Sequence, residues 1–214
     1  TMAANRLLEK SEIKRQDIGV VIHSSVCRDF LEPATSSVIH NDLELDPKCM
    51  LFDLSNACLG FLSAMTMAAN LIETGSVKHA LVVSGENGGP LIDETISMLK
   101  SDENLTRKSI KKYIANLTIG SAAVAFMLSH KDEVEGGHQI IGGHSLADTS
   151  ANVLCQGDGN TSSLMMETNS EELMKVGVKL AVDNWALTKT DLGMTNSDFN
   201  WAVGHQVSKS HEEI

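Results

Sequence analysis

Short apolar runs rich in β-branched residues alternate with stretches of helical periodicity over the first 84 residues of the chain. The apolar runs predict buried strands at residues 17–23, 49–54 and 79–84. The helical periodicity predicts helices at residues 1–10, 34–46 and 59–74. Gly75 follows the last of them, as a glycine at a helix C-terminus should. Strands that alternate with helices in this way indicate an α/β protein with a mostly parallel sheet covered by helices.

The alternation is interrupted after the third predicted strand. Residues 86–116 form a long, polar segment with a predicted helix at about 91–100, and long insertions in α/β proteins often cover a substrate site. Further along, the pattern predicts strands at 122–128, from 139 onwards and at 199–203, an amphipathic helix at 170–187, and turns at 85–90 and 157–160.

Cys58 lies where a strand-like run changes abruptly into a helix-like one, in the segment Asp53-Leu-Ser-Asn-Ala-Cys58-Leu-Gly-Phe. A thiol at a helix N-terminus faces unpaired backbone N–H groups and the positive end of the helix dipole, and both favour the thiolate. The same N–H groups can bind the oxyanion formed when the thiolate attacks a carbonyl. A nucleophile is therefore one interpretation of Cys58, and a small buried hydrophobic residue is the other.

A second reactive side chain, His205, also follows a predicted strand. Ligands of α/β sheets gather at the carboxyl ends of strands, so Cys58 and His205 both occupy positions where a site is expected. The other seven histidines lie in a strand, near element ends or beside glycine-rich turns, and their pattern indicates no zinc site. Glu32 precedes a proline and is held extended, and without further information it reads as a solvated loop carboxylate.

Composition narrows the classes of function. The 17 Lys and Arg residues against 28 Asp and Glu residues give a formal net charge of −11, which argues against nucleic acid as a partner. The four cysteines show no CxxC pair, so the sequence predicts neither a disulfide framework nor a metal site. No apolar run reaches the length of a membrane span and no signal segment is evident, so we expect a soluble, cytoplasmic protein. The chain looks cut at both ends.

Several of these segments resemble a known family. The run around Cys58 is similar to the nucleophile motif of the thiolase superfamily, in its β-ketoacyl-ACP synthase III branch. Residues 77–86 and 116–128 resemble later strands of that branch, and Gly204-His205-Gln206-Val207 resembles its His-Gln element. The resemblance implies a thiolase-like fold of αβαβα layers, incomplete at both ends here. It also implies that Cys58 is the nucleophile and His205 the catalytic histidine.

Within this branch, the chain resembles the OleA group of acyl-CoA head-to-head condensing thiolases of bacterial olefin biosynthesis. Cys27-Arg-Asp-Phe-Leu-Glu32-Pro33 matches that group, and Glu32 falls where it carries a catalytic base supplied across the dimer interface. Decarboxylating synthases usually have an apolar residue at this position. His205-Gln-Val-Ser208 also follows the OleA group, whereas decarboxylating synthases usually read His-Gln-Ala-Asn. The family's catalytic asparagine beyond the histidine and its C-terminal Gly-rich loop have no counterpart, because the chain ends at Ile214, and the asparagine of Gly159-Asn160 precedes the histidine.

The resemblance implies an N-terminal thiolase half, residues 1–130 with Cys58, and the start of a C-terminal half, residues 131–214 with His205. The insertion at about 86–116 is expected to cover the site. It predicts an acyltransferase that condenses two acyl thioesters by Claisen chemistry through a Cys58 acyl-enzyme, with Glu32 as base. The expected partners are acyl-CoA or acyl-ACP and a second copy of the chain, and no cofactor or metal is expected. Two alternatives stay open: a decarboxylating 3-oxoacyl-ACP synthase III that uses malonyl-ACP, and a catalytically incomplete fragment or partner subunit.

Overall fold

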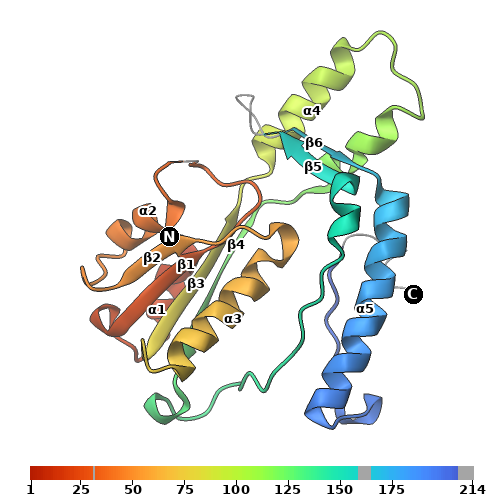
Figure 1. Ribbon diagram of the computed structural model, residues 1–214. Helices are drawn as coiled ribbons and strands as arrows, with labels where there is room; N and C mark the ends of the chain where they lie inside the picture. Colours follow the sequence, from red (N-terminus) through yellow and green to blue (C-terminus); the bar gives the residue numbers. More distant parts are fainter. Residues whose placement is uncertain (31, 159–164, 207–214) are drawn as a thin grey trace. The chain divides into compact units, whose positions relative to one another are not determined.

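The computed structural model of the protein describes residues 1–30, 32–158 and 165–206. The chain divides into two compact units (Figure 1). Unit 1 comprises residues 1–90 and 119–138, and unit 2 comprises residues 91–118 and 139–214. Unit 2 thus joins the segment that follows the third strand of the chain with the C-terminal part.

Unit 1 is built on a four-stranded sheet in the order β2-β1-β3-β4. Its strands are β1 (Ile18–His23), β2 (Met50–Asp53), β3 (His79–Glu86) and β4 (Ala122–Ser129). β1 pairs in parallel with both β2 and β3, whereas β3 and β4 are antiparallel. The carboxyl ends of β2, β1 and β3 therefore lie side by side at the same end of the sheet.

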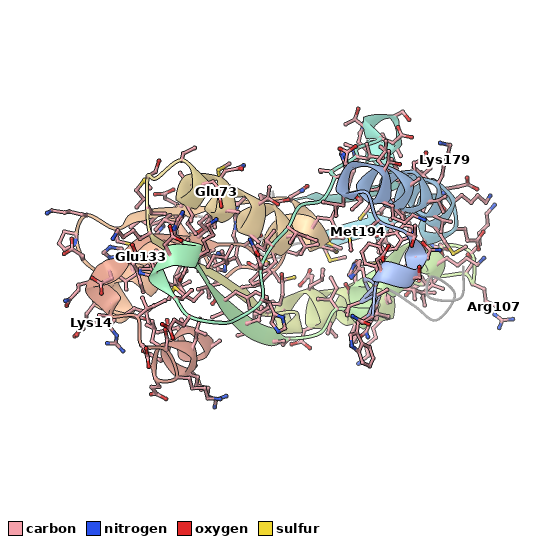
Figure 2. The ribbon with its side chains drawn as sticks, turned by 90° about the horizontal axis from the view of Figure 1, so that it is seen from below. Lys14, Glu73, Arg107, Glu133, Lys179 and Met194 are labelled. Carbon is pink, nitrogen blue, oxygen red and sulfur yellow. The ribbon has the colours of Figure 1, made fainter. Side chains whose placement is uncertain are left out.

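Helices cover both faces of this sheet (Figure 1). Alternate side chains of β1 point to opposite faces, so Val21 packs with α1 (Met2–Leu8) and α2 (Thr35–Asp42), while Val20 packs against α3 (Gly60–Glu73). Small residues on one stripe of α3, Ala64 and Ala68, are fully buried and allow the helix to approach the sheet closely. Unit 1 is thus a three-layer α/β/α arrangement, and charged side chains such as Lys14, Glu73 and Glu133 lie on its outside (Figure 2).

Unit 2 contains a two-stranded antiparallel sheet and a long helix. Its elements are most of α4 (Gly89–Ser101), η3 (Ile110–Thr118), η5 (Thr149–Leu154), β5 (Cys155–Asp158), β6 (Met165–Thr168), α5 (Ser170–Leu192) and η6 (Asn196–Asp198). The fully buried Asn116 ties three of them together, because its Nδ2 donates to Thr95 Oγ1 of α4 and to the Met166 carbonyl of β6, at 3.2 and 2.9 Å. Gly193, whose φ of 63° is left-handed, caps the C-terminus of α5. None of the helices in the described part of the chain could span a bilayer.

The predicted elements of unit 1 are confirmed within a few residues, and so are the helix after Glu86 and the amphipathic helix α5. The prediction that the whole of 85–90 is a turn was wrong, because Gly85 and Glu86 extend β3 and Gly89 begins α4. Asp158, in the second predicted turn, ends strand β5, and the remainder of that turn, Gly159-Asn160, lies outside the described residues.

Two predicted strands of unit 2 are also wrong. Residues 139–142 and 199–203 have no regular secondary structure, and the apolar side chains Ile141, Trp201 and Val203 are 61%, 89% and 93% exposed. A strand needs a neighbour that accepts and donates its backbone hydrogen bonds, and no described strand pairs with either segment. The apolar composition of the two segments predicted strands, but neither segment has a described strand with which to form backbone hydrogen bonds.

Candidate active site

Cys58 lies at the junction between β2 and α3, as its sequence context predicts. It occupies the middle of one 3₁₀ turn, η2 (Ala57–Leu59), which leads directly into the first residue of α3. The side chain is exposed. A short loop after β2 thus presents a thiol at the start of a 14-residue helix, at the carboxyl edge of the sheet.

The backbone immediately before Cys58 is strained. Ala57 has a φ of 45°, in the left-handed region that residues with a Cβ rarely adopt. Such a conformation costs on the order of 1–2 kcal/mol for a non-glycine residue and is common at functional sites. Because the chain turns sharply at Ala57, β2 and α3 are separated by only a few residues. The Cys58 thiol lies in this turn.

Gly60 brings this turn close to the end of β1. A Cβ built on Gly60 would lie 2.0 Å from Ser24 Oγ and 3.3 Å from Ser24 Cβ. Ser24 is itself fixed, because its backbone N–H donates to the Val83 carbonyl of β3 at 3.0 Å. A side chain at this first position of α3 would displace the Ser24 hydroxyl, so glycine lets the Cys58 turn lie close to the end of β1.

Asp53, the last residue of β2, joins the strand to the N-terminus of α2. Its two carboxylate oxygens accept the backbone N–H groups of Thr35 and Ser36 at 2.8 and 2.9 Å. The buried His23 Nδ1 lies 3.5 Å from the same carboxylate, and Arg28 Nη1 lies 4.0 Å from it. Burial opposes ionisation of Asp53, but the hydrogen bonds from Ser36 and Thr35 outweigh it and lower the pKa of the carboxyl group.

Glu32 lies on the loop that connects β1 to α2, and its side chain is exposed. Residues 26 and 27 of this loop are bound by Glu86 at the end of β3, whose Oε1 and Oε2 accept the N–H groups of Val26 and Cys27 at 2.7 and 2.9 Å. Neither Glu86 nor Asp53 is among the site residues predicted from the sequence. Asp53 directly follows the apolar part of β2, and Glu86 ends β3 three residues after its last apolar residue, Val83, so an acid at the carboxyl end of a strand was the signal that could have found them.

His205 belongs to unit 2, whereas Cys58 and Glu32 belong to unit 1. It is exposed, and the segment from residue 199 to residue 206 that carries it has no regular secondary structure. The remainder of the His-Gln-Val-Ser motif, residues 207 and 208, lies outside the described residues. The structure therefore places Glu32 and Cys58 in unit 1 and His205 in unit 2.

The remaining cysteines differ from Cys58 in their surroundings. Cys27 and Cys49 are buried, and burial raises the pKa of both thiols, that of Cys49 to about 11. Cys155 is exposed, but it lies in β5, where its Sγ is 3.4 Å from Thr168 Oγ1. Cys58 alone combines exposure with a position at the start of a helix. Among the described residues, no group of His, Cys, Asp and Glu side chains could hold a metal ion.

Comparisons with known proteins agree with the family that the sequence resembles. Residues 52–149 match the family model of 3-oxoacyl-[acyl-carrier-protein] synthase III. The chain has a thiolase-like fold, and the resemblance of its sequence to the β-ketoacyl-ACP synthase III branch and its OleA group is confirmed.

Two curated relatives are acyl-CoA:acyl-CoA alkyltransferases. The one from Xanthomonas campestris is 34% identical over 99% of this chain, and the one from Shewanella oneidensis is 32% identical over 99% of it. This chain spans 61% and 62% of their respective lengths.

A solved structure of Xanthomonas campestris OleA with bound lauric acid and lauroyl-CoA has a TM-score of 0.90 at 32% identity, covering 99% of this chain and 61% of that one. Other structures of that protein contain cerulenin or carry substitutions of one cysteine, one glutamate or one histidine.

Proposed function

We propose that the protein to which this chain belongs is an acyltransferase that joins two acyl-CoA molecules by a Claisen condensation without decarboxylation. The observation that carries the proposal is the combination of an OleA-like sequence and fold with the spacing of the site residues. In Xanthomonas campestris OleA the substituted glutamate precedes the substituted cysteine by 26 positions, the separation between Glu32 and Cys58 here. The substituted histidine there follows the cysteine by 142 positions, and His205 follows Cys58 by 147.

In the first half-reaction, the Cys58 thiolate attacks the thioester carbonyl of an acyl-CoA. The new bond joins Cys58 Sγ to the acyl carbon, the bond between that carbon and the sulfur of coenzyme A breaks, and coenzyme A leaves and takes up a proton. Covalent catalysis of this kind divides one difficult condensation into two easier steps. His205 stabilises the developing negative charge and assists the proton transfers. The exposed position of Cys58 at the start of α3 supports this role.

In the second half-reaction, Glu32 removes a proton from Cα of another acyl-CoA. The resulting carbanion attacks the carbonyl carbon of the Cys58 thioester, a carbon–carbon bond forms, and the Cys58 thiolate leaves. The product is a β-ketoacyl-CoA, or the β-keto acid that its hydrolysis releases. A malonyl substrate obtains the same carbanion by loss of CO₂ and needs no such base, so a carboxylate at position 32 favours the non-decarboxylating reaction.

Replacement of Glu32 tests this assignment. In the full-length protein, Glu32→Ala should still form the acyl-enzyme at Cys58 but should condense about 10²- to 10⁴-fold more slowly, because only the second half-reaction uses the base. Single-turnover measurements with lauroyl-CoA follow acyl-enzyme and β-keto product separately. Glu73→Ala, which removes another exposed carboxylate of unit 1, is the matched control and should leave both steps unchanged (Figure 2). Wild-type condensation by Glu32→Ala would overturn the proposal.

The second candidate function is a decarboxylating 3-oxoacyl-ACP synthase III, which the family match of residues 52–149 favours. Malonyl-ACP supplied together with acyl-CoA distinguishes the two candidates, because only the decarboxylating enzyme releases CO₂ as the product forms. Under either assignment the protein uses CoA or ACP thioesters, which suits a cytoplasmic location, and needs no metal or other cofactor.

A further inference from the structure

We propose that Glu86 and Asp53 are positioning residues that hold the base Glu32 in place for condensation. The segment concerned, residues 24–34, is called the Glu32 loop below. The inference rests on the proposed function, because it assigns the two carboxylates a role in the step for which Glu32 is the base. Neither carboxylate is proposed to touch the substrate.

The order of the strands places one carboxylate on each side of the Glu32 loop. The loop leaves the carboxyl end of β1, which lies between β3 and β2 in the sheet. Glu86 ends β3 and Asp53 ends β2, and both neighbours are parallel to β1. The two acids therefore lie at the same edge of the sheet as the start of the loop.

Glu86 binds the beginning of the loop. Its two carboxylate oxygens accept separate backbone hydrogen bonds, from Val26 at 2.7 Å and from Cys27 at 2.9 Å. The next residue of the chain adds to this contact, because the Asn87 N–H donates to the Cys27 carbonyl at 3.2 Å and Asn87 Nδ2 donates to Asp29 Oδ1 at 3.4 Å.

Asp53 binds the first two residues of α2, directly after the loop. The N–H groups of Thr35 and Ser36, which follow the loop directly, donate to its two oxygens at 2.8 and 2.9 Å. Arg28 Nη1, from within the loop, lies 4.0 Å from the same carboxylate. Glu32 therefore lies between two segments that carboxylates bind. Glu86 accepts the N–H groups of residues 26 and 27, and Asp53 accepts those of residues 35 and 36.

This arrangement matters because Glu32 is exposed on a loop, and a base acts only when it lies within hydrogen-bond reach of the proton it removes. A displacement of about 1 Å can cost on the order of 100-fold in rate. A carboxylate can accept two N–H donors at once, whereas an amide of the same shape turns an NH₂ group toward one of them. Glu86→Gln and Asp53→Asn therefore weaken the anchors with the smallest change in volume.

The experiment compares Glu86→Gln and Asp53→Asn with Asp46→Asn in the full-length protein. Asp46 is the matched control, since its Oδ1 accepts the Lys48 N–H at 2.8 Å elsewhere in unit 1. We expect each anchor variant to condense lauroyl-CoA about 10- to 100-fold more slowly while Cys58 acylation stays within about twofold of wild type. We also expect faster amide hydrogen exchange confined to residues 24–36. Asp46→Asn should change none of these quantities.

A double-mutant cycle separates positioning from general stability. If Glu86 acts through Glu32, adding Glu86→Gln to Glu32→Ala causes no further loss of condensation. Equal losses of acylation and condensation, additive losses in the cycle, or unchanged condensation in both anchor variants would overturn the inference while leaving the proposed function intact. Wild-type condensation by Glu32→Ala alone would overturn the proposed function, and with it the role of the anchors.

Discussion

At the scale of single residues, the properties of the four cysteines are set by their surroundings. Cys27 and Cys49 are buried and have raised thiol pKa values, so they ionise poorly near neutral pH. Cys58 and Cys155 are both exposed, but only Cys58 follows a strained residue and precedes a long helix. Reactivity of a cysteine depends on its access and on the fraction of thiolate.

We therefore predict that Cys58 reacts first with a cerulenin-like electrophile or a long-chain acyl-CoA. Mass spectrometry of peptides after brief incubation should show most of the label on Cys58. Cys155→Ser is the control for simple exposure and should not reduce the labelling, whereas Cys58→Ser should abolish most of it. Preferential labelling of Cys155, Cys27 or Cys49 would contradict the assignment of Cys58 as nucleophile.

Two helix glycines offer a second prediction at this scale. Gly60→Ala should lower the free energy of unfolding by about 1–3 kcal/mol, because its Cβ would lie 2.0 Å from Ser24 Oγ. Gly177, inside α5, has no heavy atom within 4 Å of the corresponding position, so Gly177→Ala should raise the free energy of unfolding by about 0.5–1 kcal/mol. Urea unfolding measures both. Ser24→Ala should reduce the cost of Gly60→Ala, and strictly additive effects would refute the clash.

At the scale of elements, the strands of unit 1 carry two buried histidines. Burial lowers the pKa of His23 on β1, against the opposing effect of Asp53. Burial also lowers the pKa of His79 at the start of β3, where Glu133 and Asp17 oppose the shift and His79 Nδ1 lies 2.8 Å from Ser129 Oγ. Both imidazoles resist protonation in the folded sheet. The sheet is therefore expected to lose stability in weak acid.

The direction in which stability changes with pH follows from the linkage between proton binding and folding. Below the ordinary pKa of 6.5 the unfolded chain binds a proton at His79 more readily than the folded one, so stability is complete above that pH and falls as the pH drops below it. His79→Gln should make the free energy of unfolding decrease less steeply between pH 6.5 and 5.0. The exposed His138 supplies the control variant His138→Gln. Urea titrations at several pH values test this, and identical slopes for wild type and His79→Gln would contradict it.

At the scale of the whole molecule, β4 is an edge of the four-stranded sheet among the described residues. Its side chains Val124 and Phe126 are 40% and 46% exposed although both are apolar. Open edges of sheets are usually paired or covered. We predict a homodimer that covers this edge and in which, as the family resemblance implies, Glu32 serves the Cys58 of the other copy.

Mixed dimers test that assembly. Neither Cys58→Ala nor Glu32→Ala should condense acyl-CoA alone, but a hybrid of the two contains one site with both residues intact if Glu32 acts across the interface. Co-expression with two different affinity tags should yield hybrids with about half the wild-type condensation rate, which follows from one working site of two. Inactive hybrids, or a monomer by light scattering at micromolar concentration, would contradict the prediction.

Most elements of unit 1 could be predicted from the amino-acid sequence. The runs that became β1, β2 and β3 are short, apolar and β-branched, and α3 follows with a regular period and ends at Gly75, whose φ is 72°. These signals are local, because propensity and periodicity record which side of an element is buried. The position of Cys58 between β2 and α3 could be predicted for the same reason. The resemblance then supplied the roles of Glu32 and His205, which stay predictions.

The pairing of strands and the contacts that anchor the site could not be predicted in this way, because they join segments far apart in the sequence. Residues 139–142 and 199–203 are apolar enough for strands but have no described partner. By contrast, β5 and β6 form an antiparallel pair, although the sequence predicted a turn at Gly157 and Asp158. Glu86 and Asp53 gain their roles from backbone N–H groups that lie 59 and 17 residues away in the chain. Hydrogen bonds between distant segments depend on the order of strands in the sheet, and no local period along the sequence records that order.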